Sequence, residues 1–172
     1  MMMRKNLFCY LAALMLLLSF ASPASVFASS AVLSSFTTDN FVPVFNEILE
    51  QNDLSDSVDD SDPYMDEEGA KGFYVCSDTY LMLRSDEDSD SLQSVTLTVM
   101  KLEDTEKALQ LVNSTIATAT EEGQSADVVK ELDACGMLSR KSSKESRSLS
   151  RDGLHYTLET LDTGFLLSVE TE

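Results

Sequence analysis

The residues of this chain that could do acid–base or nucleophilic chemistry are few, and its single histidine is the first candidate. His155 belongs to the segment 154–159, in which apolar and polar residues alternate, so it is expected on the polar face of a strand. A general base needs a reacting group within hydrogen-bond reach, and no nucleophile is predicted beside His155. One histidine also supplies too few groups for a catalytic triad or a histidine-rich zinc site. We interpret His155 as a surface residue.

A second candidate is the triplet Asp162-Thr163-Gly164, which matches the short motif of aspartic proteases. Those enzymes need two carboxylates that share one proton. Here Phe165 follows the triplet, where a small residue is normally found. The triplet also lies between two alternating apolar segments, and a short loop that contains glycine is typical of a β-hairpin. We therefore interpret it as a hairpin turn.

Carboxylates are the most frequent charged groups, with 30 Asp and Glu against 12 Lys and Arg. Their oxygens suit calcium, and the alternating aspartates of segment 86–90 begin like a calcium-binding loop. However, Ser91 stands where such a loop needs glycine, and Leu97 stands where it needs glutamate. The acidic segment 50–68 fits the glycine and glutamate positions of a calcium-binding loop no better. We expect these acids to be solvated charges and retain weak calcium binding as an alternative.

The first 28 residues have the three parts of a cleavable secretory signal peptide. Arg4 and Lys5 supply a positive start, residues 7–20 form an uncharged apolar run, and mostly small residues follow up to Ala28. The run is shorter than the about 20 apolar residues that a membrane-spanning helix needs. We predict cleavage after Ala28, with Ala24 as the second choice. The expected location is secreted, periplasmic or otherwise extracytoplasmic.

Removal of this segment changes the charge and the cysteine count of the mature chain. With Arg4 and Lys5 gone, 10 bases face 30 acids, so the formal net charge becomes −20 instead of −18. The remaining 144 of 172 residues suffice for one domain, and none of its segments is long and apolar enough to span a bilayer. The remaining cysteines are Cys76 and Cys135. An even pair in an oxidising compartment predicts a Cys76–Cys135 disulfide, with two buried thiols as the alternative.

The negative charge argues against nucleic acid and anionic membranes as partners, because both would repel the protein. One serine-rich segment, 140–151, departs from the acidic trend and is predicted to be a loop or an edge strand. Three roles are open for segment 140–151: it pairs with the acidic segment 50–68, it is a solvated loop, or it contacts a partner. Its basic residues, which form the predicted partner patch, are Arg140, Lys141, Lys144, Arg147 and Arg151.

Apolar periodicity predicts the elements that position these groups. Residues 29–38 are expected to be a flexible mature N-terminus, and 50–70 an acidic linker. Helical spacing predicts helices over 39–49, 104–122 and 125–135. Alternation predicts strands over 73–83, 94–99, 154–158 and 165–169. Both faces of the segment 73–83 are fairly apolar, and one carries Tyr74, Tyr80 and Met82, which is typical of a central strand.

These elements predict a single α+β domain over residues 39–172. Its antiparallel sheet of about four to five strands packs against two to three helices, in the order α-β-β-α-α-(β)-β-β. No catalytic set, cofactor site or metal site emerges. We therefore predict an exported, small, soluble domain that binds a protein or a cell-envelope component. The alternatives are a secreted hydrolase that uses carboxylates alone and a weak calcium-binding protein.

Overall fold

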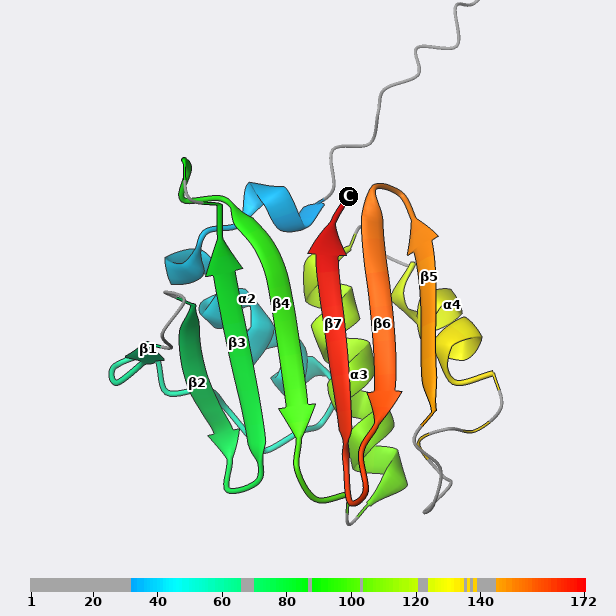
Figure 1. Cartoon of the computed structure of the whole chain (residues 1–172). Helices are drawn as coiled ribbons and strands as arrows, with labels where there is room; N and C mark the ends of the chain where they lie inside the picture. The colour runs from blue at the N-terminus through cyan, green and yellow to red at the C-terminus, as the bar shows by residue number, and fades with distance from the viewer. Residues whose placement is uncertain are drawn as a thin grey trace, which may run out of the picture.

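One antiparallel sheet of seven strands, in the order β1-β2-β3-β4-β7-β6-β5, forms the framework of the domain (Figure 1). The computed structural model describes residues 32–65, 70–86, 88–102, 104–120, 124–134, 136, 138 and 145–172, so the predicted signal peptide lies outside the described residues. The strands are β1 (Tyr64–Met65), β2 (Lys71–Cys76), β3 (Thr79–Ser85), β4 (Leu92–Val99), β5 (Ser146–Arg151), β6 (Leu154–Thr160) and β7 (Phe165–Thr171). The helices are the 3-10 turn η1 (Val32–Ser35), α2 (Thr38–Gln51), α3 (Thr105–Ala119) and α4 (Ser125–Leu132).

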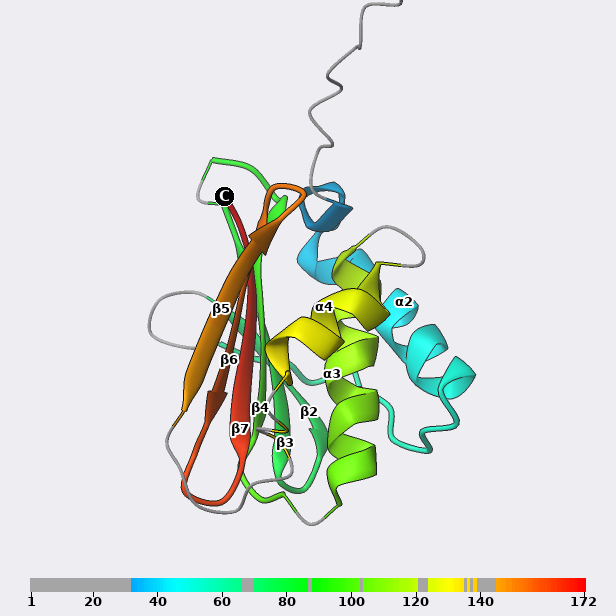
Figure 2. The same ribbon diagram turned by 90° about the vertical axis from the view of Figure 1, so that its right-hand side faces the viewer.

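The described helices all lie on one face of the sheet (Figure 2). α3 contacts α2 and α4, and it also contacts β4 and β7 in the centre of the sheet. The hydrophobic core fills the space between these helices and the sheet. Within it, Phe41 packs between Phe36 and Phe45, with ring centroids 5.4 and 6.1 Å apart. The α+β class and the antiparallel sheet therefore agree with the sequence prediction.

The number of strands is larger than predicted, and the segment 73–83 accounts for part of the difference. This segment is a hairpin of β2 and β3, joined by a turn at Ser77-Asp78 that contains neither Gly nor Pro. Alternation continues through the turn, and Tyr74 pairs with Tyr80 across it, so both rings lie on the same face. The pattern therefore resembled one long strand. The short β1 is not predicted from the sequence. Segment 140–151, for which the sequence predicts a loop or an edge strand, contains the edge strand β5.

The helix that follows β4 begins where the sequence predicts. The Asp104 carboxylate accepts hydrogen bonds from the backbone N–H groups of Glu106 (2.8 Å) and Lys107 (3.4 Å). Such an N-cap satisfies amides that have no partner within the helix. Both helices of the pair end earlier than predicted, α3 at Ala119 and α4 at Leu132.

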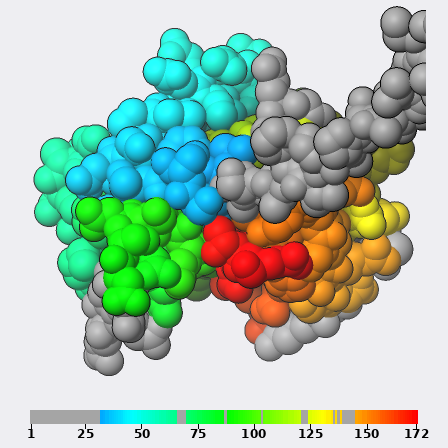
Figure 3. All heavy atoms as spheres, turned by 90° about the horizontal axis from the view of Figure 1, so that it is seen from above, coloured from blue at the N-terminus to red at the C-terminus, as the bar shows by residue number. Residues whose placement is uncertain are grey.

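The segment after the predicted cleavage site is ordered from Val32 onwards, although its composition predicts flexibility. Leu33 is fully buried in the core. The N–H of Leu92 donates to the Phe36 carbonyl (2.8 Å), and Thr37 forms an isolated bridge with Ser91. Seen from above, η1 and the start of α2 (blue) lie against the β3–β4 connection (green) and the end of β7 (red) (Figure 3). This segment therefore covers one end of the sheet.

The described part of the acidic segment, 50–65, is attached to the helices rather than detached from them. The Asn46 side chain accepts from the N–H of Val58 (2.8 Å) and donates to its carbonyl (3.0 Å). Asp56 forms an ion pair with Lys107 at the start of α3 (2.5 Å). The hydrogen bond with Asp56 raises the pKa of Lys107. The other acids of segment 50–65 are mostly exposed.

The stability of the fold is expected to fall at alkaline pH because of Tyr156, a fully buried residue of β6. Burial disfavours the tyrosinate and raises the pKa of Tyr156 to about 12. Below the ordinary tyrosine pKa of about 10, the folded and the unfolded protein both keep the proton of Tyr156. Between pH about 10 and 12, the unfolded protein loses this proton first. The free energy of unfolding therefore falls by about 2 to 3 kcal/mol as the pH rises through this range. In urea unfolding at pH 8 and pH 11, Tyr156→Phe should lose less stability than the wild type. An identical loss in both proteins would contradict this assignment.

Candidate binding face of the sheet

The face of the sheet opposite the helices, here called the open face, is crossed by three rows of side chains. Residues directly opposite each other in neighbouring strands point to the same face, and successive residues of a strand point to opposite faces. The strand register therefore defines each row. The end row is Arg84, Ser94, Glu170, His155 and Ser150. The central row is Met82, Thr96, Ser168, Thr157 and Ser148. The third row is Tyr74, Tyr80, Thr98, Leu166, Glu159 and Ser146.

Hydroxyl groups dominate these rows, and the central row carries no charge. The charged residues of the three rows are Arg84, Glu159 and Glu170, with Arg84 and Glu170 on either side of Ser94. In contrast, exposed acids are frequent in α2 and in the segment that follows it, including Glu47, Asp53 and Asp60. The open face therefore differs chemically from the acidic surface of the helical side.

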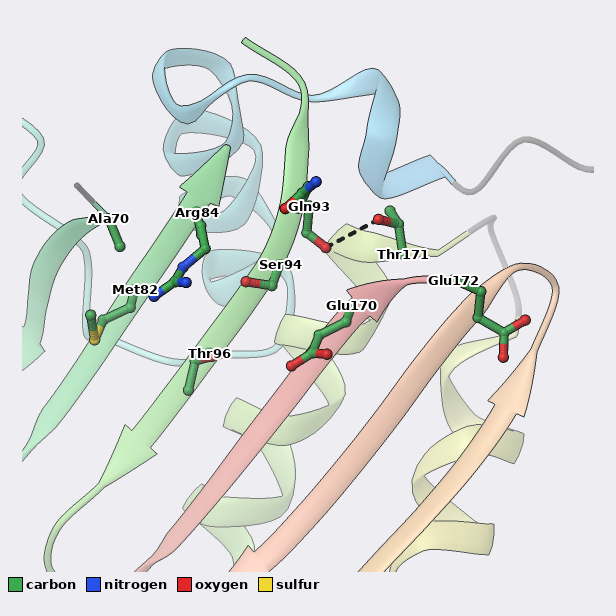
Figure 4. Close-up of a pocket in the computed structure, with 9 residues that line it drawn as sticks. All are labelled: Ala70, Met82, Arg84, Gln93, Ser94, Thr96, Glu170, Thr171 and Glu172. Atoms are coloured by element: carbon green, nitrogen blue, oxygen red, sulfur yellow. Dashed lines mark hydrogen bonds between the residues drawn. The ribbon is translucent and has the colours of Figure 1, made fainter. Parts of the chain in front are cut away.

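A hollow of about 700 Å³ lies on this face, over the ends of β3, β4 and β7 (Figure 4). Figure 4 shows its side chains in front of the sheet, with the helices behind. The Ser168 hydroxyl donates to a carboxylate oxygen of Glu170 (2.8 Å), and it lies 3.5 Å from the Thr96 hydroxyl. These bonds connect the central row to the end row and position Glu170 at the hollow. The lining residues are Ala70, Met82, Arg84, Gln93, Ser94, Thr96, Glu170, Thr171 and Glu172.

Three tyrosines from β1, β2 and β3 form a cluster at one side of the open face. The ring centroids of Tyr64 and Tyr74 are 5.7 Å apart, and those of Tyr74 and Tyr80 are 5.1 Å apart. Gly72 allows this arrangement, because a Cβ atom there would overlap the Tyr64 ring. Tyr74 remains 59% exposed despite its two neighbours. The alternation of segment 73–83 places Tyr74 and Tyr80 on one face, but it does not predict the cluster, because Tyr64 joins it only through the unpredicted strand β1.

His155 has a hydroxyl group beside it, contrary to the expectation that no nucleophile lies nearby. Ser150 of the neighbouring strand β5 places its Oγ 3.0 Å from the His155 Nδ1. Glu170 is the cross-strand neighbour of His155 on the other side. Neither Ser150 nor His155 is among the residues that line the hollow. We interpret the pair as a hydrogen-bonding part of the open face, in keeping with the surface assignment of His155.

The triplet Asp162-Thr163-Gly164 forms the connection between β6 and β7, which confirms the hairpin interpretation. Asp162 is exposed. The Thr163 hydroxyl donates to the Met100 carbonyl (2.6 Å), and a Cβ at Gly164 would overlap the carbonyl oxygen of Val99. The triplet therefore packs its backbone against the end of β4, which is a structural role.

The aspartates of segment 86–90 that resemble a calcium loop stabilise a turn. Asp86 accepts hydrogen bonds from the N–H of Asp88 (2.7 Å) and from the Gln93 side chain (2.9 Å). Asp59 in the other acidic segment accepts two hydrogen bonds from Ser61, which lower the pKa of Asp59. Within the part of the chain that the structure describes, no group of three or more His, Cys, Asp or Glu is arranged to hold a metal ion.

The predicted disulfide and the predicted partner patch are only partly covered by the described residues. Cys76, at the end of β2, forms no disulfide with another described residue, and Cys135 lies outside the described residues, so the Cys76–Cys135 bridge stays a prediction.

The patch residues Arg140, Lys141 and Lys144 also lie outside the described residues. The other two, Arg147 and Arg151, contact Glu131 of α4 and not the acidic segment 50–65: Arg151 forms an ion pair with its carboxylate (3.0 Å), and Arg147 donates to its carbonyl (3.4 Å).

Comparison of the chain with protein-family models, with curated proteins and with solved structures finds no match. Among the helices that the structure describes, none has the length and apolar character needed to cross a membrane.

Proposed function

We propose that the mature protein is an exported binding domain and that the open face of its sheet is the binding surface. The observation that supports this proposal is the one-sided arrangement of the layers: the helices bury one face, and the other presents three rows of side chains with a hollow of about 700 Å³. Export follows from the signal peptide predicted over residues 1–28, with cleavage after Ala28. The partner is a protein or another component of the cell envelope.

The composition of this face suits contact with a ligand. An antiparallel sheet can leave one face in water, and strands favour threonine over aspartate and glutamate. The central row presents short hydroxyl side chains, which cost little conformational entropy when a ligand orders them. The exposed ring of Tyr74 adds a large, rigid contact group. A surface with both kinds of group suits binding.

The carboxylate-dependent hydrolase is less well supported by the open face. Glu170 is opposite His155, and Glu159 lies four residues further along β6. At about 3.3 Å per residue, their backbone positions are about 13 Å apart along the strand, and Glu159 is not among the residues that line the hollow. The Ser168 hydroxyl also occupies one oxygen of Glu170.

The proposal predicts that a bulky charge in the central row weakens binding to the envelope. Thr157→Arg changes a partly exposed residue at the middle of β6 and leaves the core face of the strand intact. In co-sedimentation of the mature protein with envelopes isolated from the source organism, we expect its affinity to fall at least about tenfold, equivalent to about 1.4 kcal/mol.

Ser57→Arg is the matched control, because it adds the same charge at an exposed site outside the sheet. It should bind like the wild type. If the two variants bind equally well, or if the wild type does not sediment with envelopes, the proposed function is wrong.

A further inference from the structure

The tyrosine cluster and the hydroxyl rows lie on the same face, and together they define the chemistry of its ligand. We propose that the open face binds an uncharged carbohydrate chain of the cell envelope. Sugar rings stack on Tyr74 and its neighbours, while sugar hydroxyls bond to the central row. This inference rests on the proposed function and names the partner of that same surface.

The tyrosine cluster supplies the stacking surface. A sugar ring has an apolar face of C–H groups and a rim of hydroxyls, and a tyrosine ring has an apolar face and one hydroxyl at its tip. Tyr74 is held between Tyr64 and Tyr80, with ring centroids 5.7 and 5.1 Å away, yet it is 59% exposed. Its position is therefore fixed by its neighbours while much of its surface stays accessible to a ligand.

The central row supplies the hydrogen bonds. Each serine or threonine hydroxyl donates one hydrogen bond and accepts others, so its best partner also offers both donors and acceptors. Thr96 and Thr157 lie on either side of Ser168 across β4, β7 and β6, next to the row that contains Tyr74 and Tyr80. Ser168 is buried and donates to Glu170, so the partly exposed Thr96 and Thr157 offer the hydroxyls. A polyhydroxylated ligand that lies across these strands meets aromatic and hydroxyl groups at the same time.

Charge excludes the anionic alternatives. Without Arg4 and Lys5 the formal net charge of the mature chain is −20, so nucleic acid, phosphate-rich polymers and acidic polysaccharides are repelled. Arg84 is the single cation of the three rows, and Glu170 stands on the other side of Ser94 from it. A basic ligand, in turn, is attracted more strongly to the exposed acids of α2 and the segment 50–62 than to the uncharged central row.

A protein partner is less well matched, because stable protein interfaces depend on buried aromatic or aliphatic anchors. Among the described residues, the exposed large hydrophobic side chains are Met65, Tyr74 and Met100. Met65 points to the helical side of the sheet, because it pairs with Lys71, which binds Asp39 of α2. Tyr74 is thus the one exposed anchor within the three rows; its ring neighbours are Tyr64 and Tyr80, and the row continues beyond Tyr80 with Thr98.

The test compares the mature protein on three probes: untreated envelopes of the source organism, envelopes digested with proteinase, and envelopes oxidised with periodate, which cleaves vicinal diols of sugars. Binding should survive digestion and fall at least about tenfold after oxidation. Tyr74→Ala should weaken binding to the digested envelopes at least about tenfold, and Tyr74→Phe, which keeps the ring, by less than about threefold. Met65→Ala is the matched control, since it removes a 58% exposed side chain from the other face, and it should bind normally.

A second readout needs no variant. The chain has no tryptophan, so its intrinsic fluorescence comes from tyrosine, and soluble fragments of the digested envelope should change this fluorescence in a saturable way.

Binding that proteinase destroys and periodate spares would overturn the carbohydrate assignment and leave the proposed function intact. Binding that survives both treatments would also overturn it. If Tyr74→Ala, Thr157→Arg and the controls all bind alike, the proposed function fails as well.

Discussion

Gly164→Ala is expected to lower the free energy of unfolding by about 3 kcal/mol, the upper end of what overpacking costs. The reason is the close approach of the β6–β7 turn to β4, where a Cβ atom would overlap the Val99 carbonyl oxygen. This neighbour is backbone held in the sheet, so it cannot rotate away as a side chain does. The Thr163–Met100 hydrogen bond and the bond from the Leu102 N–H to the Thr163 carbonyl (2.7 Å) would be strained by the same shift. Urea unfolding followed by circular dichroism measures the change.

Asp162→Ala is the control for this prediction, because it alters an exposed side chain of the same turn. Its effect should stay within about 0.5 kcal/mol, as for most surface substitutions. Native stability of Gly164→Ala would show that the turn does not pack against β4 as described.

Leu33→Ala should destabilise the protein by about 2–5 kcal/mol, the usual cost of removing a buried leucine side chain. Leu33 is fully buried, although it lies only five residues after the predicted cleavage site at Ala28. A flexible N-terminus, which composition predicts for residues 29–38, would instead make the substitution neutral. The same unfolding measurement therefore decides whether this segment belongs to the core.

Leu149→Ala is the matched control, since it makes the same change at a partly buried site of the edge strand β5. Its cost should be clearly smaller than that of Leu33→Ala. Equal unfolding midpoints for Leu33→Ala and the wild type would contradict the burial of η1 against the sheet.

Local features of the fold could be predicted from the sequence because their causes are local. Asp104 caps α3 through its own neighbours, and the alternation around His155 indicates a strand whichever strand pairs with it. The turn at Asp162-Thr163-Gly164 was correctly distinguished from a protease motif on the same basis. Boundaries were less accurate: the Ser77-Asp78 turn has no Gly or Pro to mark it, and two strands were read as one.

Local sequence patterns were therefore sufficient for the α+β class, the antiparallel strands and most helix starts, since propensity, capping and periodicity act over a few residues. Which faces of these elements meet and which stay uncovered depends on their packing in three dimensions. The Tyr64–Tyr74–Tyr80 cluster and the contact between Ser150 and His155 depend on strand register, which burial of the opposite face sets. The burial of Leu33 depends on the contacts of η1 with α3, β4 and β7, which no local pattern describes. The open face is likewise a product of assembly, because it is the surface that remains after the helices have covered the other side of the sheet.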